Sequence, residues 1–449
     1  MGYLLDAIEK YLKQNPARFH MPGHKGTNIF GKCNFTPLEQ YDLTEIKGLD
    51  NLYESEGCIS NLEERVSKIL GFKSIITAGG STSCIQAMLA SVCNPGDKII
   101  VDRNVHISVV NSIAVLNLTP IWLFRKPQED CAFGAQISAE DVKKTLNANS
   151  NVKCVFLTGE DYYGLAPNIL EISKVCLEHN VYLLVDNAHG AYYSFLNKHP
   201  MQLGASMCCD SWHKTLQALT GAAVLLMQDD FDTHFVKKRM QIFSSSSPSY
   251  LVLLSMDICA DYLYKEFETD FKTFIERITE FKCEIKRLGF DILNDNEASV
   301  MKLTISGLKM GINGIDLAGI LRDNCIEPEY VDYNCVVLLV NMFNRPQDFE
   351  RLRKSLQNIQ KKAQLPGISY CLTHEPEVAC SIRTAMFAES RKVSIKKSEG
   401  CIAGQILPKC PPCVPVIMPG EVISEDVVSI LDSCGYKFID IIEEEGALI

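Results

Sequence analysis

The chain has 449 residues, of which 47% are hydrophobic and 22% charged, values typical of a soluble globular protein. The net charge of −11 and the lack of a long basic run argue against a nucleic-acid partner, and no apolar run is long enough to cross a membrane. The nineteen cysteines follow no regular spacing, so we expect reduced thiols in a cytoplasmic protein.

Residues 1–50 are expected to form an N-terminal segment. Four apolar residues lie on one helical face of its first thirteen residues: Leu4, Leu5, Ile8 and Leu12. This pattern predicts an amphipathic surface helix rather than a signal peptide, because no apolar core follows a basic start. His20 and His24 have the spacing of a helical zinc site, but Pro22-Gly23 breaks a helix between them. We therefore predict no metal here.

Residues 51–290 are predicted to form a large α/β domain. Short β-type runs alternate with helical stretches, among them His106 onward and Ile169–His179. The runs expected as strands are Ser74–Thr77, Lys98–Val101, Thr119–Leu123, Lys153–Leu157, Tyr182–Val185 and Ala222–Met227. This alternation predicts a mainly parallel sheet with helices on both faces, and ligands of such sheets gather at the carboxyl ends of the strands.

The rest of the chain predicts a long helix and two smaller units. Residues Tyr250–Leu288 are expected to be helical and to leave the large domain. A small α/β domain is expected over residues 291–366, from strands at Val300–Ile305 and Cys335–Val340 and helices at Ile315–Asn324 and Pro346–Ala363.

Residues 367–449 are predicted to form a proline-rich C-terminal module. Within it, Cys410 and Cys413 flank Pro411-Pro412 with a spacing that occurs in redox and zinc sites. Zinc needs a second pair of ligands, and none follows nearby. Two reduced cysteines in a turn are the preferred interpretation.

Lys214, in Ser211-Trp212-His213-Lys214, is the most informative residue of the chain. A lysine alone is usually a solvated surface charge. Asp186, however, directly follows the apolar run Tyr182–Val185. Enzymes that use pyridoxal phosphate (PLP) need this pair, since a lysine holds the cofactor aldehyde as a Schiff base and an acid keeps the pyridine nitrogen protonated. The pair predicts PLP chemistry.

The stretch Gly79-Gly80-Ser81-Thr82-Ser83 lies between a predicted strand and a predicted helix. Glycine permits close approach of the backbone, and hydroxyl and N–H groups at a helix start can hold a phosphate. The alternative is a plain turn with a Ser or Thr N-cap.

Two histidines also follow predicted strands. His106 is a candidate for stacking on the cofactor ring, and the alternative is a helix-capping or partly buried histidine. His189, three residues after Asp186, is a candidate for a hydrogen bond near that acid or for proton transfer. A neutral structural role for His189 is equally open.

Taken in order, these motifs resemble those of the fold type I Orn/Lys/Arg decarboxylases, bacterial PLP enzymes that act on basic amino acids. The resemblance covers nearly the whole chain and includes Phe19-His20-Met21-Pro22-Gly23-His24, Arg103-Asn104-Val105-His106, Tyr162-Tyr163-Gly164, Ala188-His189-Gly190, His213-Lys214-Thr215-Leu216 and Pro419-Gly420-Glu421. It implies a PLP-dependent transferase-like large domain of the aspartate aminotransferase type, with a small α/β domain and a C-terminal decarboxylase-type module. The activity it implies is decarboxylation of arginine, lysine or ornithine, in polyamine synthesis or acid tolerance.

The resemblance also implies roles for individual residues. Lys214 would carry PLP, Asp186 would pair with the pyridinium, and Lys214 or His213 would protonate Cα after carbon dioxide leaves. His106 would stack on the ring. The residues expected around the phosphate are Ser81, Thr82, Ser83, Ser211 and His213. The chain resembles the family's short form, which lacks a receiver-like N-terminal domain, and a homodimer with shared active sites is expected.

Several residues depart from the family pattern, which leaves the substrate and full activity open. They are Ile107, Asn187, Gly159-Glu160-Asp161 and Gly221. A basic substrate needs an anionic group at the far end of its pocket. The candidates are Glu160, Glu421 and Asp161, with Glu54 and Glu56 of a neighbouring subunit. The alternative for Glu160 and Asp161 is a solvated turn.

Two other functions compete with decarboxylation. Another PLP reaction, such as transamination or β-elimination, is one. A transaminase usually clamps the α-carboxylate with an arginine, for which Arg345 is a candidate. The second is a PLP-binding relative with a regulatory role and no catalysis.

Overall fold

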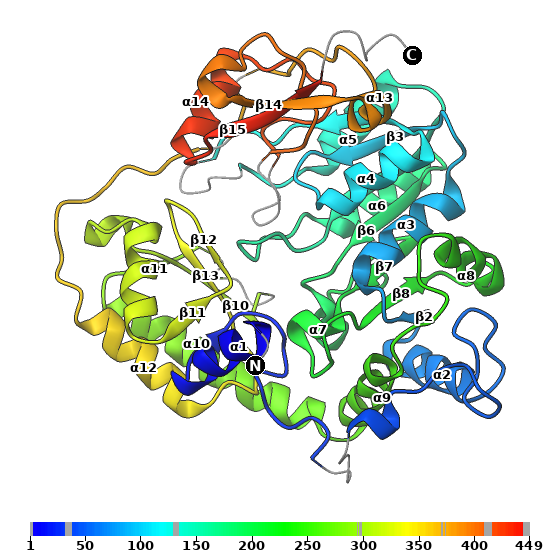
Figure 1. The fold of residues 1–449 in the computed structure, drawn as a ribbon, viewed down its shortest axis with the longest axis horizontal. Helices are drawn as coiled ribbons and strands as arrows, with labels where there is room; N and C mark the ends of the chain where they lie inside the picture. Colours follow the sequence, from blue (N-terminus) through cyan, green and yellow to red (C-terminus); the bar gives the residue numbers. More distant parts are fainter. Residues whose placement is uncertain are drawn as a thin grey trace.

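The computed structural model describes residues 3–31, 38–128, 134–293, 295, 299–369, 371–372, 374–407 and 415–442. Cys410, Cys413 and the two prolines between them lie outside these ranges. Figure 1 shows the large sheet with its helices on the right, the smaller sheet with its helices on the left, and the C-terminal unit at the top.

The large sheet has seven strands in the order β2-β8-β7-β6-β5-β3-β4. The strands are β2 (Lys73–Thr77), β3 (Lys98–Asp102), β4 (Thr119–Leu123), β5 (Val152–Thr158), β6 (Tyr182–Asp186), β7 (Met207–Asp210) and β8 (Ala223–Met227). Neighbours from β4 to β7 are parallel, whereas β8 is antiparallel to both β7 and β2. All strands except β8 therefore end at one edge. The prediction of a mainly parallel sheet is confirmed.

Helices cover this sheet, and its strands are apolar on both faces. The helices are α2 (Cys58–Leu70), α3 (Gly80–Val92), α4 (Ile107–Leu116), α5 (Ala139–Ala148), α6 (Ile169–Glu178), α7 (Trp212–Thr215) and α8 (Thr233–Ile242). Val155, Phe156 and Leu157 are consecutive in β5, and all three are fully buried. A strand buried on both faces needs such a continuous apolar run, which explains why these runs could be found in the sequence.

The smaller sheet is antiparallel, in the order β12-β13-β10-β9. Its strands are β9 (Asp291–Ile292), β10 (Lys302–Ser306), β12 (Tyr330–Val331) and β13 (Val336–Leu339). The helices around it are α10 (Phe267–Arg287), α11 (Gly314–Asp323) and α12 (Pro346–Gln357), and α9 (Tyr250–Lys265), which precedes α10, packs against α2. The predicted domain boundaries at residues 290 and 366 bracket this sheet.

Two predicted helices differ from those observed. The segment Tyr250–Leu288 is two helices, because Glu266 leaves the helical conformation with φ −123° and ψ −27°. The helix expected to run to Ala363 ends at Gln357. Beyond it, the N–H groups of Lys362 and Leu365 donate to carbonyls of the 308–310 turn and no longer continue the helix.

The two ends of the chain attach to different units. After α1 (Tyr3–Lys13), β1 (Ala17–Phe19) pairs in parallel with β11 (Ile326–Pro328), which joins the N-terminal segment to the small domain. The C-terminal unit contains α13 (Ile382–Phe387), β14 (Ser390–Ser394), α14 (Glu425–Ser433) and β15 (Phe438–Ile442), with a core of its own. Short 3₁₀ helices span Leu38–Tyr41, Ala191–Leu196, Leu308–Met310 and Ile395–Lys397.

Every helix in the ranges given above is too short or too polar to span a lipid bilayer. The fifteen cysteines in these ranges are all free.

Gly221, next to the start of β8, supports the turn at the start of α3. Its φ is +102°, a Cβ there would lie 2.8 Å from the Ala78 carbonyl oxygen, and its own carbonyl accepts a hydrogen bond from Gly80 N–H at 2.8 Å. We expect Gly221→Ala to lower the free energy of unfolding by about 1–3 kcal/mol, measured by urea unfolding.

Gly319→Ala is the matched control, because Gly319 lies within α11 and a Cβ there meets nothing within 4 Å. That substitution should raise the free energy of unfolding by about 0.5–1 kcal/mol. A Gly221→Ala protein as stable as the wild type would contradict the close contact with Ala78.

Candidate active site

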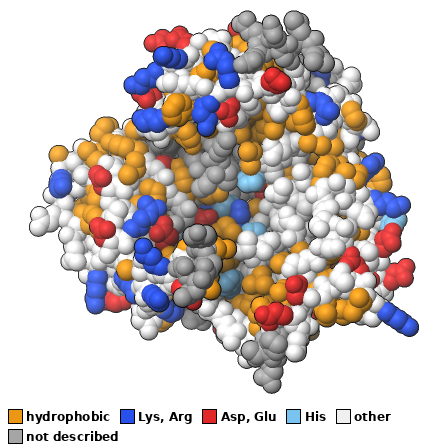
Figure 2. Space-filling model, viewed as in Figure 1, with side chains coloured by type: hydrophobic (Ala, Val, Ile, Leu, Met, Phe, Trp, Pro, Cys, Tyr) orange, Lys and Arg blue, Asp and Glu red, His pale blue; other side chains and the backbone are white. Residues whose placement is uncertain are grey.

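The carboxyl ends of the parallel strands bring the predicted site residues to one edge of the large sheet. His106 follows β3, Glu160 follows β5, Asp186 ends β6, and Lys214 lies on α7 after β7. Figure 2, in the same view as Figure 1, shows histidine side chains inside a hollow near the middle of the molecule. The sequence order of these residues thus becomes a spatial cluster, as expected for a parallel sheet.

Lys214 contacts His189 directly. Its Nζ lies 3.1 Å from His189 Nε2, and His189 is only 6% exposed. Burial lowers the pKa of His189 well below its usual value, and the neighbouring positive charges of Lys214 and Lys302 lower it further. A neutral His189 accepts a hydrogen bond from Lys214 Nζ at Nε2 and carries its own proton at Nδ1. That Nδ1 is buried and has no hydrogen-bond partner among the described residues.

Asp186 is held at the end of β6 by its neighbours. Its Oδ1 accepts hydrogen bonds from Ala188 N–H at 3.0 Å and from Cys209 Sγ at 3.6 Å. These contacts fix the direction of a carboxylate that is 7% exposed. His189 forms its hydrogen bond with Lys214, so this histidine is linked to the lysine rather than to Asp186.

The residues around Lys214 on α7 offer unused hydrogen-bonding groups. Ser211 Oγ, Trp212 Nε1 and Thr215 Oγ1 are buried and have no partner in the described part of the chain. An unpaired buried donor costs about 1–3 kcal/mol, and a bound ligand is one way to satisfy it. Hydroxyl and indole donors beside a lysine suit a cofactor that carries an aldehyde and a phosphate. The residues present therefore fit PLP.

The Gly79–Ser83 turn starts α3 without a side-chain cap. The N-cap is Gly79, which makes no side-chain cap hydrogen bond, so the alternative of a Ser or Thr N-cap is wrong. Ser83 Oγ instead donates to the Gly80 carbonyl at 2.9 Å and holds the turn from inside. Ser81 is partly exposed and Thr82 exposed. An uncapped helix start leaves N–H groups available to an anion.

His106 is the N-cap of α4. Its Nδ1 accepts from Ser108 N–H at 3.2 Å and lies 2.8 Å from Ser108 Oγ, so the helix-capping interpretation is confirmed. These contacts lie in the plane of the imidazole and leave its faces unused. Capping therefore fixes the ring orientation without preventing the stacking role, which stays a prediction.

Glu160 and Asp161 are buried, so the interpretation of a solvated turn is wrong. Glu160 accepts from Tyr192 Oη at 3.0 Å and pairs with Lys302 Nζ at 3.5 Å. Asp161 pairs with Arg125 at 3.0 Å, and Arg125 also binds Asp102 at 2.7 Å. Both acidic side chains are neutralised by cations that are themselves buried.

Glu421 is also paired in the interior. Its two oxygens accept from Arg103 Nη1 at 2.7 Å and Nη2 at 2.6 Å, and Met418 N–H donates to it at 2.8 Å. Arg103 lies three residues before His106, so this ion pair joins the C-terminal unit to the loop that carries the histidine. Arg383, on α13 of the C-terminal unit, also contacts the large domain, because it donates to the Ala114 carbonyl at the end of α4.

Asn187, a departure from the family pattern, faces into a buried network. Its Nδ2 donates to Asp210 Oδ1 at 2.7 Å, and Asp210 also contacts His199 Nε2 at 3.1 Å. With Cys208, the last two residues form a group of potential metal ligands whose ligand atoms lie within 4.8 Å of one another. The direct contact between His199 and Asp210 already satisfies two of the three.

Three residues to which the sequence analysis gave no role lie at the site. Tyr162 packs edge-on against His189 with ring centroids 4.9 Å apart, and Thr215 follows Lys214 with an unpaired hydroxyl. Lys302 is fully buried in β10, and its charge influences His189. A lysine inside the apolar run Val300–Ile305 was a signal available in the sequence.

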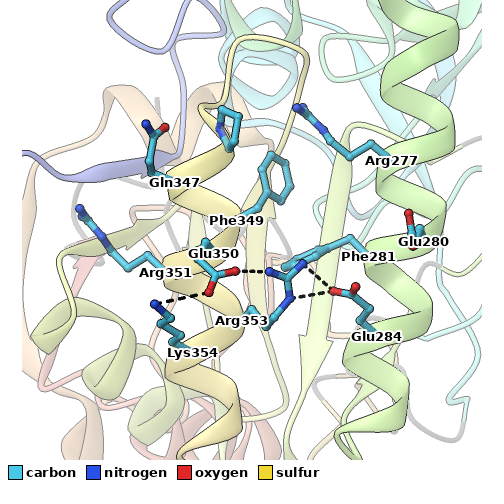
Figure 3. A pocket seen from close by; sticks show the side chains of 11 residues that line it. Arg277, Glu280, Phe281, Glu284, Gln347, Phe349, Glu350, Arg351, Arg353 and Lys354 are labelled. Carbon is cyan, nitrogen blue, oxygen red and sulfur yellow. Dashed lines mark hydrogen bonds and ion pairs between the residues drawn. The ribbon is translucent and has the colours of Figure 1, made fainter.

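A separate cavity of about 920 Å³ lies between α10 and α12 (Figure 3). Four of its charged side chains pair with one another: Arg353 contacts Glu284 at 2.8 Å and also Glu350, which Lys354 approaches at 3.4 Å. The guanidinium of Arg277 stacks on Phe349 at 4.7 Å. No predicted site residue lines this cavity, and its contacts are those of a joint between two helices.

The family model described as "Orn/Lys/Arg decarboxylase, major domain" matches residues 3–308, well over half of the chain. The chain therefore belongs to the Orn/Lys/Arg decarboxylase family. An arginine decarboxylase of Bacillus subtilis is 26% identical over 95% of this chain and 92% of its own length. One of Halalkalibacterium halodurans is 29% identical over 94% of this chain and 91% of its own length.

Among solved structures, a lysine decarboxylase of Francisella novicida aligns with a TM-score of 0.75 at 18% identity, covering 94% of this chain and 78% of that one. This likeness shows a shared fold, the fold type I of PLP enzymes. The predictions of family, fold class and amino acid decarboxylase are confirmed. PLP is the cofactor that the family and the fold imply.

His213 is expected to stay neutral in the folded protein at all but acidic pH. It is buried, its Nδ1 donates to the Ala222 carbonyl at 3.0 Å, and burial lowers its pKa to about 4. Because an unfolded histidine titrates near 6.5, protonation favours unfolding, and the stability contributed by neutral His213 is lost as the pH falls from about 6.5 to 4.

Nuclear magnetic resonance of the histidine-labelled protein measures this directly, with the His213 signal assigned by its loss in His213→Gln. We expect an inflection near pH 4. A transition near pH 6.5 would show that the imidazole is solvated.

Proposed function

We propose that this chain is a PLP-dependent decarboxylase that converts a basic amino acid, arginine, lysine or ornithine, to the corresponding amine and carbon dioxide. The contact between Lys214 and a neutral, buried His189 carries the proposal, since it places a lysine among unpaired donors at the edge where Asp186 ends β6. Bound PLP would withdraw electrons from the substrate bond between Cα and the carboxylate.

The chain's own residues would hold the cofactor and handle the proton. Lys214 would attach it, Asp186 would place a negative charge beside the pyridine nitrogen, and the His106 ring would face it. The phosphate would lie among Ser81, Thr82, Ser83, Ser211 and His213. An opposite charge stabilises a protonated pyridine, which is the stronger electron acceptor.

The proton that replaces the carboxylate on Cα has two candidate donors, Lys214 and His213. The pKa of His213 is lowered to about 4 by burial, so this histidine is neutral at physiological pH, with its Nδ1 proton given to the Ala222 carbonyl. These properties support Lys214 as the acid. His189, bonded to Lys214 at 3.1 Å, would orient its amine.

We also propose a cytoplasmic homodimer with shared active sites, in polyamine synthesis or acid tolerance. The apolar face of α1 supports an assembly, because Leu4 is 74% exposed, and Leu5, Ile8 and Leu12 on the same face are exposed too. Sedimentation equilibrium would test the dimer.

Transamination is the weaker alternative. Arg345, the candidate carboxylate clamp, is engaged by Asp348 at 2.8 Å and by Asn15 at 2.8 Å. Products discriminate between the possible reactions. The purified protein with PLP should release carbon dioxide and one amine, without keto acid, from at least one of the three amino acids. A yellow protein that converts none of them would favour the regulatory relative.

Lys214→Ala is expected to abolish turnover, because no other group on α7 carries an amine. Carbon dioxide release from the preferred amino acid measures this. A variant that retains the wild-type rate would overturn the assignment of Lys214.

Asp186→Asn should still bind PLP and lose activity by orders of magnitude, because an amide does not hold the pyridine nitrogen in its charged form. PLP content is measured by absorbance and turnover by amine production. Near-native turnover would contradict the role of Asp186.

Glu160 and Glu421 were candidates for binding the far end of the substrate. Because Arg103 engages Glu421 through both oxygens, we expect Glu421→Gln to act on stability, with a loss of about 3–5 kcal/mol from an unpaired buried arginine. The KM for the preferred amino acid should stay within about twofold. A tenfold rise in KM at unchanged stability would instead assign Glu421 to the substrate.

Glu160→Gln tests the other candidate carboxylate in the same way, because it leaves the buried cation of Lys302 without its ion-pair partner. If both variants keep the Michaelis constants for arginine, lysine and ornithine, neither carboxylate selects the substrate.

A further inference from the structure

The lysine helix α7 is a single turn, Trp212–Thr215. The last carbonyls of any helix lack partners inside it, and in so short a helix most of them must bond elsewhere. The Trp212 carbonyl accepts from Leu216 N–H at 2.8 Å. The carbonyls on either side of Lys214, those of His213 and Thr215, accept their hydrogen bonds from distant parts of the chain.

The His213 carbonyl accepts from Gly23 N–H at 2.7 Å, and the Thr215 carbonyl from Asn341 Nδ2 at 3.2 Å. Gly23 belongs to the N-terminal segment, whereas Asn341 lies two residues beyond β13 in the small domain. The turn that carries Lys214 is thus held from two sides by backbone and side-chain donors of other units.

Asn341 also links these two sides to each other. Its Nδ2 donates to the Gly23 carbonyl at 2.7 Å, and its Oδ1 accepts from Phe343 N–H at 3.0 Å. The side chain is 1% exposed, and both ends of its amide are used. Reversing the amide would turn its oxygen toward two carbonyl oxygens, so the donor orientation is fixed.

The approach of Gly23 to α7 leaves no room for a side chain. A Cβ on Gly23 would lie 2.3 Å from the Leu216 carbonyl oxygen and 2.9 Å from the Thr215 carbonyl carbon. Lys25 keeps the same segment on the small domain, because its Nζ donates to the His20 carbonyl at 2.8 Å and the Leu339 carbonyl at 3.0 Å. The Leu339 carbonyl ends β13, two residues before Asn341.

We infer that Asn341 is a positioning residue for Lys214. By binding the Gly23 and Thr215 carbonyls together, it sets the place of the lysine turn relative to the N-terminal segment and the small domain. The inference rests on the proposed function, in which Lys214 attaches PLP. A merely structural asparagine would affect stability and leave the attachment of PLP unchanged.

Asn341→Asp tests this, because it keeps the side-chain shape and replaces the Nδ2 donor by an oxygen that faces two carbonyls. The primary measurement is the rate constant for attachment of added PLP to the cofactor-free protein. It is followed by absorbance and checked by borohydride trapping. We expect attachment at least tenfold slower than in the wild type, a similar loss in kcat, and a KM within threefold.

Asn334→Asp is the matched control. Asn334 is a buried asparagine of the same domain whose Nδ2 donates to the Ile368 carbonyl at 2.8 Å, and Ile368 belongs to the linker that follows the small domain. This variant should lose comparable thermal stability and attach PLP within twofold of the wild-type rate.

The inference is overturned if the rate constant for PLP attachment to Asn341→Asp lies within fivefold of that for Asn334→Asp. A rate constant more than fivefold lower supports it. If Asn341→Asp yields no folded protein, Asn341→Ala, which removes the donor without adding charge, is judged by the same threshold. A wild-type protein that takes up no PLP overturns the proposed function instead.

Discussion

The pairing of buried charges at the carboxyl edge of the large sheet is the constraint on which the rest of the structure depends. Arg103 and Glu421 join the large domain to the C-terminal unit, and Lys302 and Glu160 join it to the small domain. An unpaired buried charge is costly, so separating either unit from the edge would leave a charge without a partner. The same ion pairs that hold the domains together therefore surround the candidate site.

The electrostatics of the site follow from this arrangement. Lys214 and Lys302 bring positive charge into a buried region, and together with burial they keep His189 neutral. Burial does the same for His213, whose pKa falls to about 4. Lys214 is thus the group proposed to carry the proton, and the neutral imidazoles of His189 and His213 orient their neighbours by hydrogen bonding. The cluster suits a reaction in which one amine first holds a cofactor and later donates a proton.

Local patterns in the sequence were sufficient for much of the fold, and they supplied the candidates for the core of the site. Asp186 could be proposed because a continuous apolar run marks β6, and Lys214 could be proposed from its pairing with Asp186 and from the motif around it. The strand β7 was missed, since its residues Met207–Asp210 include no β-branched or aromatic side chain. Ion pairs between distant residues could not be predicted from local patterns, since Arg103 and Glu421 are 318 positions apart. For acidic residues such as Glu160, a local pattern suggests solvent exposure. The contact of Asn341 with Gly23, over the same separation, had no local signal either.

The central claim is that Lys214 is the lysine that carries PLP. Reduction of the PLP-loaded protein with borohydride, followed by digestion and mass spectrometry of the peptides, tests it most directly. The structure offers other lysines in low-dielectric surroundings, among them Lys25, whose pKa burial lowers to about 7, and the fully buried Lys302. We expect the reduced cofactor on Lys214. Its attachment to another lysine in a protein that decarboxylates basic amino acids would contradict the account.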